Sequence, residues 1–65
     1  MAGIFVLVSL QGTFETKLEY CHATSRRQAI ASFRRDRHNR YLPFPSNFTV
    51  RPGTVDDTRY LRLAG

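Results

Sequence analysis

The sequence predicts a small α+β domain of β-β-α-β(-β) order, in which one amphipathic, basic helix packs on a sheet of three or four strands. Two β-branched and aromatic runs, residues 4–10 and 13–22, stand on either side of a glycine turn and predict a hairpin. A helical segment with a serine cap follows over about residues 26–38. A third apolar run, which ends at a Pro-Gly turn signal, extends the sheet.

The length and composition of the chain predict one globular domain, residues 1–65. At this size folding buries only about 60% of the surface of the unfolded chain, so we expect modest stability. Hydrophobic residues make up 42% of the chain, which is ordinary for a globular protein. The single cysteine, Cys21, excludes an internal disulfide and favours a reducing compartment, so the predicted location is the cytoplasm.

The first run, residues 4–10, is apolar on both of its alternating faces, which is typical of a central strand covered on two sides. It is too short to cross a bilayer and has no basic segment before it, so we expect a strand and no membrane partner. Residues 13–22 alternate more cleanly and predict a half-buried partner strand. We expect Phe5 and Leu7 on the face away from the helix, where the C-terminal segment, a second copy in a homodimer or another partner would cover them.

The helix is expected to begin after Ser25, which forms a capping box with Gln28. At about 100° per residue, Ala29, Ile30 and Phe33 gather on one face, so this face should pack on the sheet. After the helix, two nearby prolines predict a loop over residues 41–47. A strand over residues 48–51 follows, and residues 58–63 return as a fourth strand, which we favour, or as a short helix.

The positive charge is concentrated on the predicted helix. The chain carries ten Lys and Arg against five Asp and Glu, a net charge of +5. Six of the ten lie in or just after the helix: Arg26, Arg27, Arg34, Arg35, Arg37 and Arg40. Only one acid, Asp36, lies among them, where it can pair with Arg40 one turn later, so we expect most of this charge to be free. The partner would be nucleic acid, bound through its phosphates, or an acidic protein surface, and the alternative is a solvated face that only confers solubility.

The proline-stiffened loop after the helix is the second candidate contact. Tyr41 and Phe44 are large aromatic side chains that can anchor a protein interface or stack on unpaired bases. The alternative is that Leu42 or Phe44 folds back to close the end of the core. The candidate partner-binding residues are therefore Tyr41, Phe44 and the six arginines of the helix.

The sequence predicts no metal site, no cofactor and no catalytic group. Cys21 and His22 are adjacent on a strand and point to opposite faces, and His38 is distant, so they do not assemble a zinc site. Asp56 and Asp57 are typical turn formers, and the chain has neither a glycine-rich phosphate loop nor a nucleophile motif. We therefore expect a binding protein and not an enzyme.

Four segments, once placed on these elements, carry a resemblance: Phe5-Val6-Leu7-Val8, Gly12-Thr13-Phe14-Glu15, Ala23-Thr24-Ser25 entering the helix, and Phe48-Thr49-Val50-Arg51. Their layout resembles that of small phage early proteins, such as the podovirus inhibitor of host RNA polymerase. The resemblance covers about residues 4–51 and implies a non-enzymatic regulator that binds and inhibits a host protein or nucleoprotein machine in the host cytoplasm. The helix of that family is acidic whereas this one is basic, so the resemblance assigns no contact residue.

The layout is also similar to a small ribosomal protein of archaeal and eukaryotic large subunits, which implies direct RNA binding through the basic helix. The sequence therefore predicts two alternative functions. The protein is either a regulator that docks on another protein or a protein that binds nucleic acid directly. Phosphate binding should weaken steeply with salt and depend evenly on the arginines, whereas a protein interface should depend on a few anchor residues.

Overall fold

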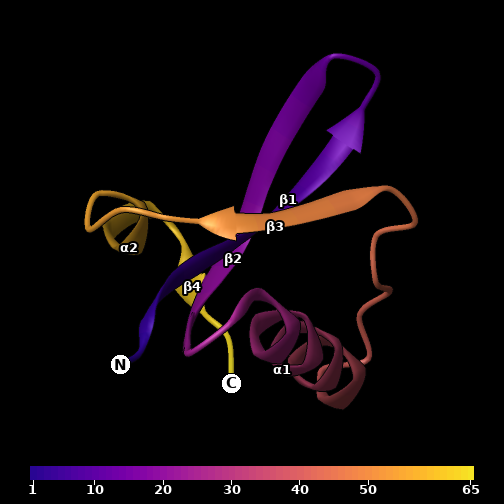
Figure 1. The fold of residues 1–65 in the computed structure, drawn as a ribbon. Helices are drawn as coiled ribbons and strands as arrows, with labels where there is room; N and C mark the ends of the chain where they lie inside the picture. The colour runs from indigo at the N-terminus through magenta and orange to yellow at the C-terminus, as the bar shows by residue number, and fades with distance from the viewer.

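The computed structural model describes residues 1–65 and places one long helix against a four-stranded mixed sheet (Figure 1). In chain order the elements are β1 (Gly3–Gln11), β2 (Phe14–Ala23), α1 (Arg26–Asn39), β3 (Phe48–Pro52), α2 (Asp57–Tyr60) and β4 (Arg62–Leu63). The strands lie in the order β3-β1-β2-β4, with β1 antiparallel to both of its neighbours and β4 parallel to β2. The predicted α+β class and the β-β-α-β order are confirmed.

Strands β1 and β2 form the predicted hairpin, and Gly12 adopts a φ of 60° in its turn, a conformation that suits glycine. Strand β3 pairs only with Phe5–Ser9 of β1. The hairpin beyond Ser9 therefore extends as a two-stranded ribbon past β3 and away from α1 (Figure 1). Phe14, beside the turn of this ribbon, is 77% exposed.

A bulge in β2 changes which side chains face the helix. Leu7 lies opposite Glu19 and the next pair is Val8 with Lys17, so Leu18 has no partner on β1. Leu18 packs on the core and Glu19 is bonded to α1, whereas Lys17 reaches the opposite side of the sheet. A strictly alternating strand would have placed Lys17 and Glu19 on the same face.

Helix α1 packs on the sheet face that carries Phe5 and Leu7, so the predicted assignment of faces is wrong. Leu7, Ala29 and Phe33 are fully buried in one cluster, and Phe5 packs against it. Because the first strand is apolar on both faces, its pattern could not show which face receives the helix. This face is covered within one chain, so it offers no exposed Phe5 and Leu7 surface to a second copy.

The opposite face of the sheet carries Val6 and Val8, which are also buried. The chain after β3 packs here, and it comes so close that a Cβ on Gly53 would overlap the Cγ2 atom of Val6. Lys17 Nζ donates to Asp57 Oδ1 at 2.6 Å and closes the same side. The sheet is therefore covered on both sides by its own chain, as the two-faced pattern of β1 predicts.

The start of α1 follows the prediction closely. Ser25 is the N-cap, and its Oγ atom accepts a hydrogen bond from the amide of Gln28 at 3.1 Å. The side chain of Gln28 reaches back to Thr24, whose amide donates to Oε1 at 2.6 Å. The predicted apolar face, Ala29 with Ile30 and Phe33, is the one that meets the sheet.

The C-terminal segment combines both forms that the sequence left open. Helix α2 occupies its first part and β4, only two residues long, follows. The hydrogen bond from Lys17 Nζ, supported by the amide of Thr54 at 2.8 Å, holds the pKa of Asp57 below its ordinary value. Asp57 thereby links the turn before α2 to the sheet.

Candidate binding surface on helix α1

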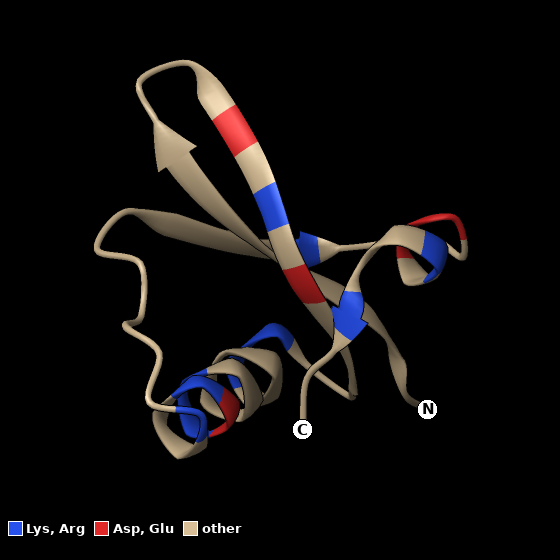
Figure 2. Ribbon diagram, turned by 180° about the vertical axis from the view of Figure 1, so that it is seen from behind, with Lys and Arg blue, Asp and Glu red and all other residues tan.

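All five acidic side chains of the chain take part in ion pairs. The pairs are Glu15 with Arg51; Glu19 with Arg37, Arg40 and Arg62; Asp36 with Arg40 and Arg62; Asp56 with Arg59; and Asp57 with Lys17. They use six of the ten cationic side chains. The other four are Arg26, Arg27, Arg34 and Arg35. All four lie on α1 (Figure 2). They account for four of the five net positive charges, and the fifth stays in the network in which Glu19 and Asp36 share Arg37, Arg40 and Arg62.

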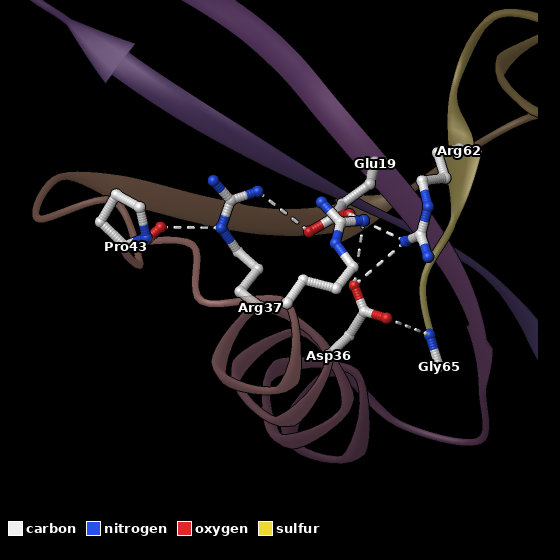
Figure 3. A network of polar contacts seen from close by, with 7 residues as sticks. Glu19, Asp36, Arg37, Pro43, Arg62 and Gly65 are labelled. Atoms are coloured by element: carbon white, nitrogen blue, oxygen red, sulfur yellow. Dashed lines mark hydrogen bonds and ion pairs between the residues drawn. The ribbon is translucent and has the colours of Figure 1, made fainter.

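Glu19 is the centre of the main ion-pair network (Figure 3). The residue is 2% exposed, and Arg37 Nη1 and Arg40 Nη1 approach its two carboxylate oxygens to 3.1 and 3.4 Å. Arg37 is held further by a hydrogen bond from Nε to the carbonyl of Pro43 at 2.9 Å. The expectation that Asp36 would be the only acid near the helix arginines is therefore wrong, because the bulge in β2 turns Glu19 toward them.

Asp36 extends the network to the C-terminus of the chain (Figure 3). It makes the predicted ion pair with Arg40, at 3.4 Å. It also accepts hydrogen bonds from Arg62 Nη1 and from the amide of Gly65, both at 3.2 Å. Arg37 and Arg40 thus hold α1, β2 and the loop after the helix together, and we leave them out of the binding surface.

Arg26 has a different structural role. Its Nε atom donates to the carbonyl of Val50 at 2.9 Å, so this guanidinium lies along the outer edge of β3. Arg26 makes no ion pair, but its hydrogen bond to Val50 fixes its side chain against the sheet.

Arg34 is held by aromatic rings. Its guanidinium carbon lies 4.4 Å from the ring centroid of Phe44, and Phe44 in turn packs edge-on against Phe48. Phe44 also packs against the core, so the alternative that it folds back is confirmed. Stacking of this kind restrains the arginine side chain without using its N–H groups, which remain able to donate to a partner.

The two remaining arginines, Arg27 and Arg35, make no hydrogen bond or ion pair within the chain. With Arg34 and His38 they lie on the outward side of α1, at spacings that bring residues to one helix face around the small side chain of Ala31. All five residues are exposed. The stripe is about 16 Å long, since the helix rises about 1.5 Å per residue.

The position of Arg27 is unfavourable for the helix itself. The first turn of α1 holds Arg26 and Arg27 and no acidic residue. The helix dipole places partial positive charge at this end, so each cation there costs about 0.3–1 kcal/mol. Arg26 is offset by its bond to Val50, but Arg27 has no such partner. Its presence is therefore better explained by contact with another molecule than by stability.

Tyr41 stands at the other end of the stripe in a strained conformation. The amides of Tyr41 and Leu42 donate to the carbonyls of His38 and Arg37 at 3.1 and 2.9 Å, which forms a Schellman motif. Tyr41 occupies the position where glycine is usual, with a φ of 57°, and it is the only non-glycine residue with a positive φ. Its side chain is 96% exposed, so no contact within the chain offsets the strain.

We call Arg27, Arg34, Arg35, His38 and Tyr41 the α1 patch. Of the eight residues that the sequence singled out for binding, four lie in it. The structure places the other four, Arg26, Arg37, Arg40 and Phe44, in contacts that hold the fold together. Glu19 determines which arginines are held within the fold. The sequence could not identify Glu19 as their partner, because no local pattern reveals the bulge in β2.

The rest of the molecule adds no pocket and no cluster of three or more His, Cys, Asp or Glu side chains. Burial, with a smaller contribution from the charge of Glu19, raises the pKa of the Cys21 thiol. Neither helix combines the length and apolarity that a membrane crossing needs. Comparisons with known proteins assign no family, since no protein-family model matches the chain and no curated protein or solved structure is significantly similar to it.

Proposed function

We propose that this chain is a small, non-enzymatic binding protein that docks on an acidic surface of another protein through the α1 patch. One observation carries the proposal. The four arginines that have no acidic partner all lie on α1, and the outward face of this helix ends at an exposed, strained tyrosine. Strain that persists without an internal contact to offset it is typical of residues kept for function.

The composition of the patch favours a protein partner. Arginine and tyrosine are enriched at the centres of protein interfaces, where a few buried anchors provide most of the binding energy. Arg34 is restrained by Phe44 and Tyr41 by the Schellman motif, so little side-chain and backbone entropy is lost when a partner binds. Guanidinium groups in this setting suit carboxylates, which they bind with two parallel hydrogen bonds.

The resemblance to small phage early proteins suggests where the protein acts and on what kind of partner. By analogy, the protein acts in the host cytoplasm as a regulator that binds and inhibits a host protein or nucleoprotein machine.

Direct nucleic-acid binding is the second candidate, favoured by the net charge of +5 and the exposed arginine face. The number of free arginines limits it. Three guanidinium groups on phosphates would give a log-log salt slope of about −2.7, so affinity would fall only about 40-fold between about 50 and about 200 mM salt. A protein that makes about 6–10 such contacts loses about 10³- to 10⁵-fold over the same range.

The test compares patch variants with a matched control. Arg35→Ala and Tyr41→Ala alter the patch, whereas Arg59→Ala removes another exposed arginine, on α2. Each variant is immobilised and used to capture proteins from host lysate, and each is titrated with labelled duplex DNA, single-stranded DNA and structured RNA at two salt concentrations. We expect one acidic protein that the parent and Arg59→Ala retain and that both patch variants lose.

Two results would overturn the proposal. If the parent and both patch variants captured the same proteins, the α1 patch would not be the surface that binds the partner. Micromolar binding to DNA or RNA that collapses with salt, and that weakens evenly for every arginine variant including Arg59→Ala, would assign the charge to phosphates.

A further inference from the structure

The edges of the sheet differ in how they are closed. An edge strand exposes main-chain N–H and C=O groups on every second residue, and these can pair with another strand. Leu10 donates to the carbonyl of Asn47, and Gly53 donates to the carbonyl of Ile4, so the even-numbered residues of β1 bond toward β3. The odd-numbered residues of β1 therefore bond toward β2.

The edge of β3 is blocked over its C-terminal part. Because Val6 and Val8 bond to their partners Arg51 and Thr49, the main-chain groups of the alternate residues of β3 point outward. These residues are Phe48, Val50 and Pro52. The carbonyl of Val50 accepts the hydrogen bond from Arg26, and Pro52 has no N–H to offer. This edge cannot receive a strand without losing the Arg26 bond.

The edge of β2 is covered only over the short stretch that β4 reaches. Strand β4 pairs with Glu19 and Tyr20, and Ala64 donates to the carbonyl of Tyr20 at 2.7 Å. Toward the hairpin turn nothing pairs with β2 except β1. Here Glu15 and Lys17 lie opposite even-numbered residues of β1, Leu10 and Val8, so their own main-chain groups point outward. They are the open positions of the edge between β4 and the hairpin turn.

We propose that this open edge pairs with the same edge of a second copy of the chain, in an antiparallel arrangement with Thr16 on the two-fold axis. Main-chain pairing requires outward residues to face outward residues, which leaves three registers. Two of them place Glu15 against Glu15 or Lys17 against Lys17, and like charges directly opposite are unfavourable. The third places Glu15 of each copy against Lys17 of the other, twice. Glu15 and Lys17 pair with Arg51 and Asp57 within the chain, but both side chains are nearly half exposed and can also face the second copy. Charge complementarity therefore selects both the occupant and the register.

This pairing also accounts for an exposed side chain. In the selected register Phe14, which is 77% exposed, comes beside Leu18 of the second copy, and both lie on the α1 side of the sheet. A two-fold axis perpendicular to the sheet puts both α1 helices on the same face, so the dimer presents two α1 patches in one direction.

The dimer should be weak. Strand β4 begins beside Glu19, which limits the pairing to about four residues of each copy. Stable interfaces bury about 1,200–2,000 Å², more than so short a pairing can bury. We therefore expect a dissociation constant between about 0.1 and about 1 mM.

Sedimentation equilibrium from about 20 μM to about 1 mM protein tests the proposal. Glu15→Lys places like charges opposite each other at both ends of the pairing and should weaken dimerisation roughly tenfold. Asp56→Lys is the matched control, since it raises the net charge from +5 to +7 just as Glu15→Lys does, but on the exposed turn before α2. It should leave the dimer unchanged apart from general repulsion.

A mixing experiment tests the register itself. Lys17→Glu gives an edge with two acids and Glu15→Lys an edge with two bases, so each should be monomeric alone and the mixture should form a heterodimer. Because Lys17→Glu also breaks the bond to Asp57, its fold is checked by circular dichroism. If that variant does not fold, amide exchange of the parent provides the second measurement, in which the amides of Glu15 and Lys17 should become protected only at high concentration.

Three results would overturn the proposal. The parent could remain monomeric at about 1 mM, with the amides of Glu15 and Lys17 exchanging freely. The edge would then not pair with a second copy, and a strand of a different protein would be its partner. Glu15→Lys could dimerise as the parent does. Asp56→Lys could weaken the dimer as strongly as Glu15→Lys, which would make net charge, and not the edge, the cause.

Discussion

Replacing Tyr41 by glycine should make the protein more stable while removing a residue proposed for binding. Tyr41 adopts a φ of 57° at the glycine position of the Schellman motif. Both hydrogen bonds of the motif are made by main-chain groups, so the substitution keeps them. The ring is 96% exposed, so its loss removes little buried surface.

The size of the effect follows from two opposing contributions. The left-handed conformation costs a residue with a Cβ about 1–2 kcal/mol, and glycine is free of this cost. Glycine loses more conformational entropy on folding, which offsets about 0.5–1 kcal/mol of the gain. The net stabilisation is about 0.5–1 kcal/mol, or a rise in Tm of about 3–6 °C for a domain of this size.

The assay is urea and thermal denaturation followed by circular dichroism, with Tyr41→Ala as the matched control. Alanine also removes the ring but keeps a Cβ in the left-handed position, so it should stay within about 0.5 kcal/mol of the parent. If Tyr41→Gly were no more stable than Tyr41→Ala, the strain argument for Tyr41 would be refuted. Both variants should lose partner binding equally, because both lack the ring.

Three further predictions concern the contacts that hold the fold. Glu19→Gln removes the buried carboxylate from between three arginines and should lower the free energy of unfolding in urea by about 3 kcal/mol; a loss below about 1 kcal/mol would contradict a structural role. The pKa of Asp57 lies below its ordinary 3.8, so its contribution to stability is complete above that pH and is lost as pH falls through the lowered value. Urea titrations between about pH 5 and about pH 2 should show a steeper loss for the parent than for Asp57→Asn, and parallel curves would exclude Asp57 as the cause. Gly53→Ala forces a Cβ into Val6 and should cost about 1–3 kcal/mol, whereas Gly3→Ala, with nothing within 4 Å, should cost nothing measurable by thermal denaturation; equal effects would remove the close approach as the reason for glycine.

The local elements could be predicted because their signals lie within a few residues of one another. The capping serine and glutamine mark the start of α1, Gly12 marks the hairpin turn, and Ala29 with Phe33 marks the helix face that meets the sheet. Each depends on spacing along one element, so no knowledge of the rest of the chain is required.

The face of the sheet and the direction of Glu19 could not be predicted in this way. β1 is apolar on both faces, so either face could have received the helix. In the structure the helix packs on the face that carries Phe5 and Leu7. The bulge at Leu18 has no sequence mark of its own, yet it turns Glu19 from the side of Lys17 to the side of α1.

The sequence by itself determined the order of the elements, the net charge and its concentration on one helix. Only the tertiary structure decided which of those charges remain free. Ion pairing is a matter of distance in space, and the deciding partners are far apart in the chain, 18 residues for Arg37 with Glu19 and 26 for Arg62 with Asp36. Folding brings these acids to the inward side of α1 and neutralises its C-terminal arginines there, which leaves the outward arginines, beside Tyr41, as the surface available to a partner.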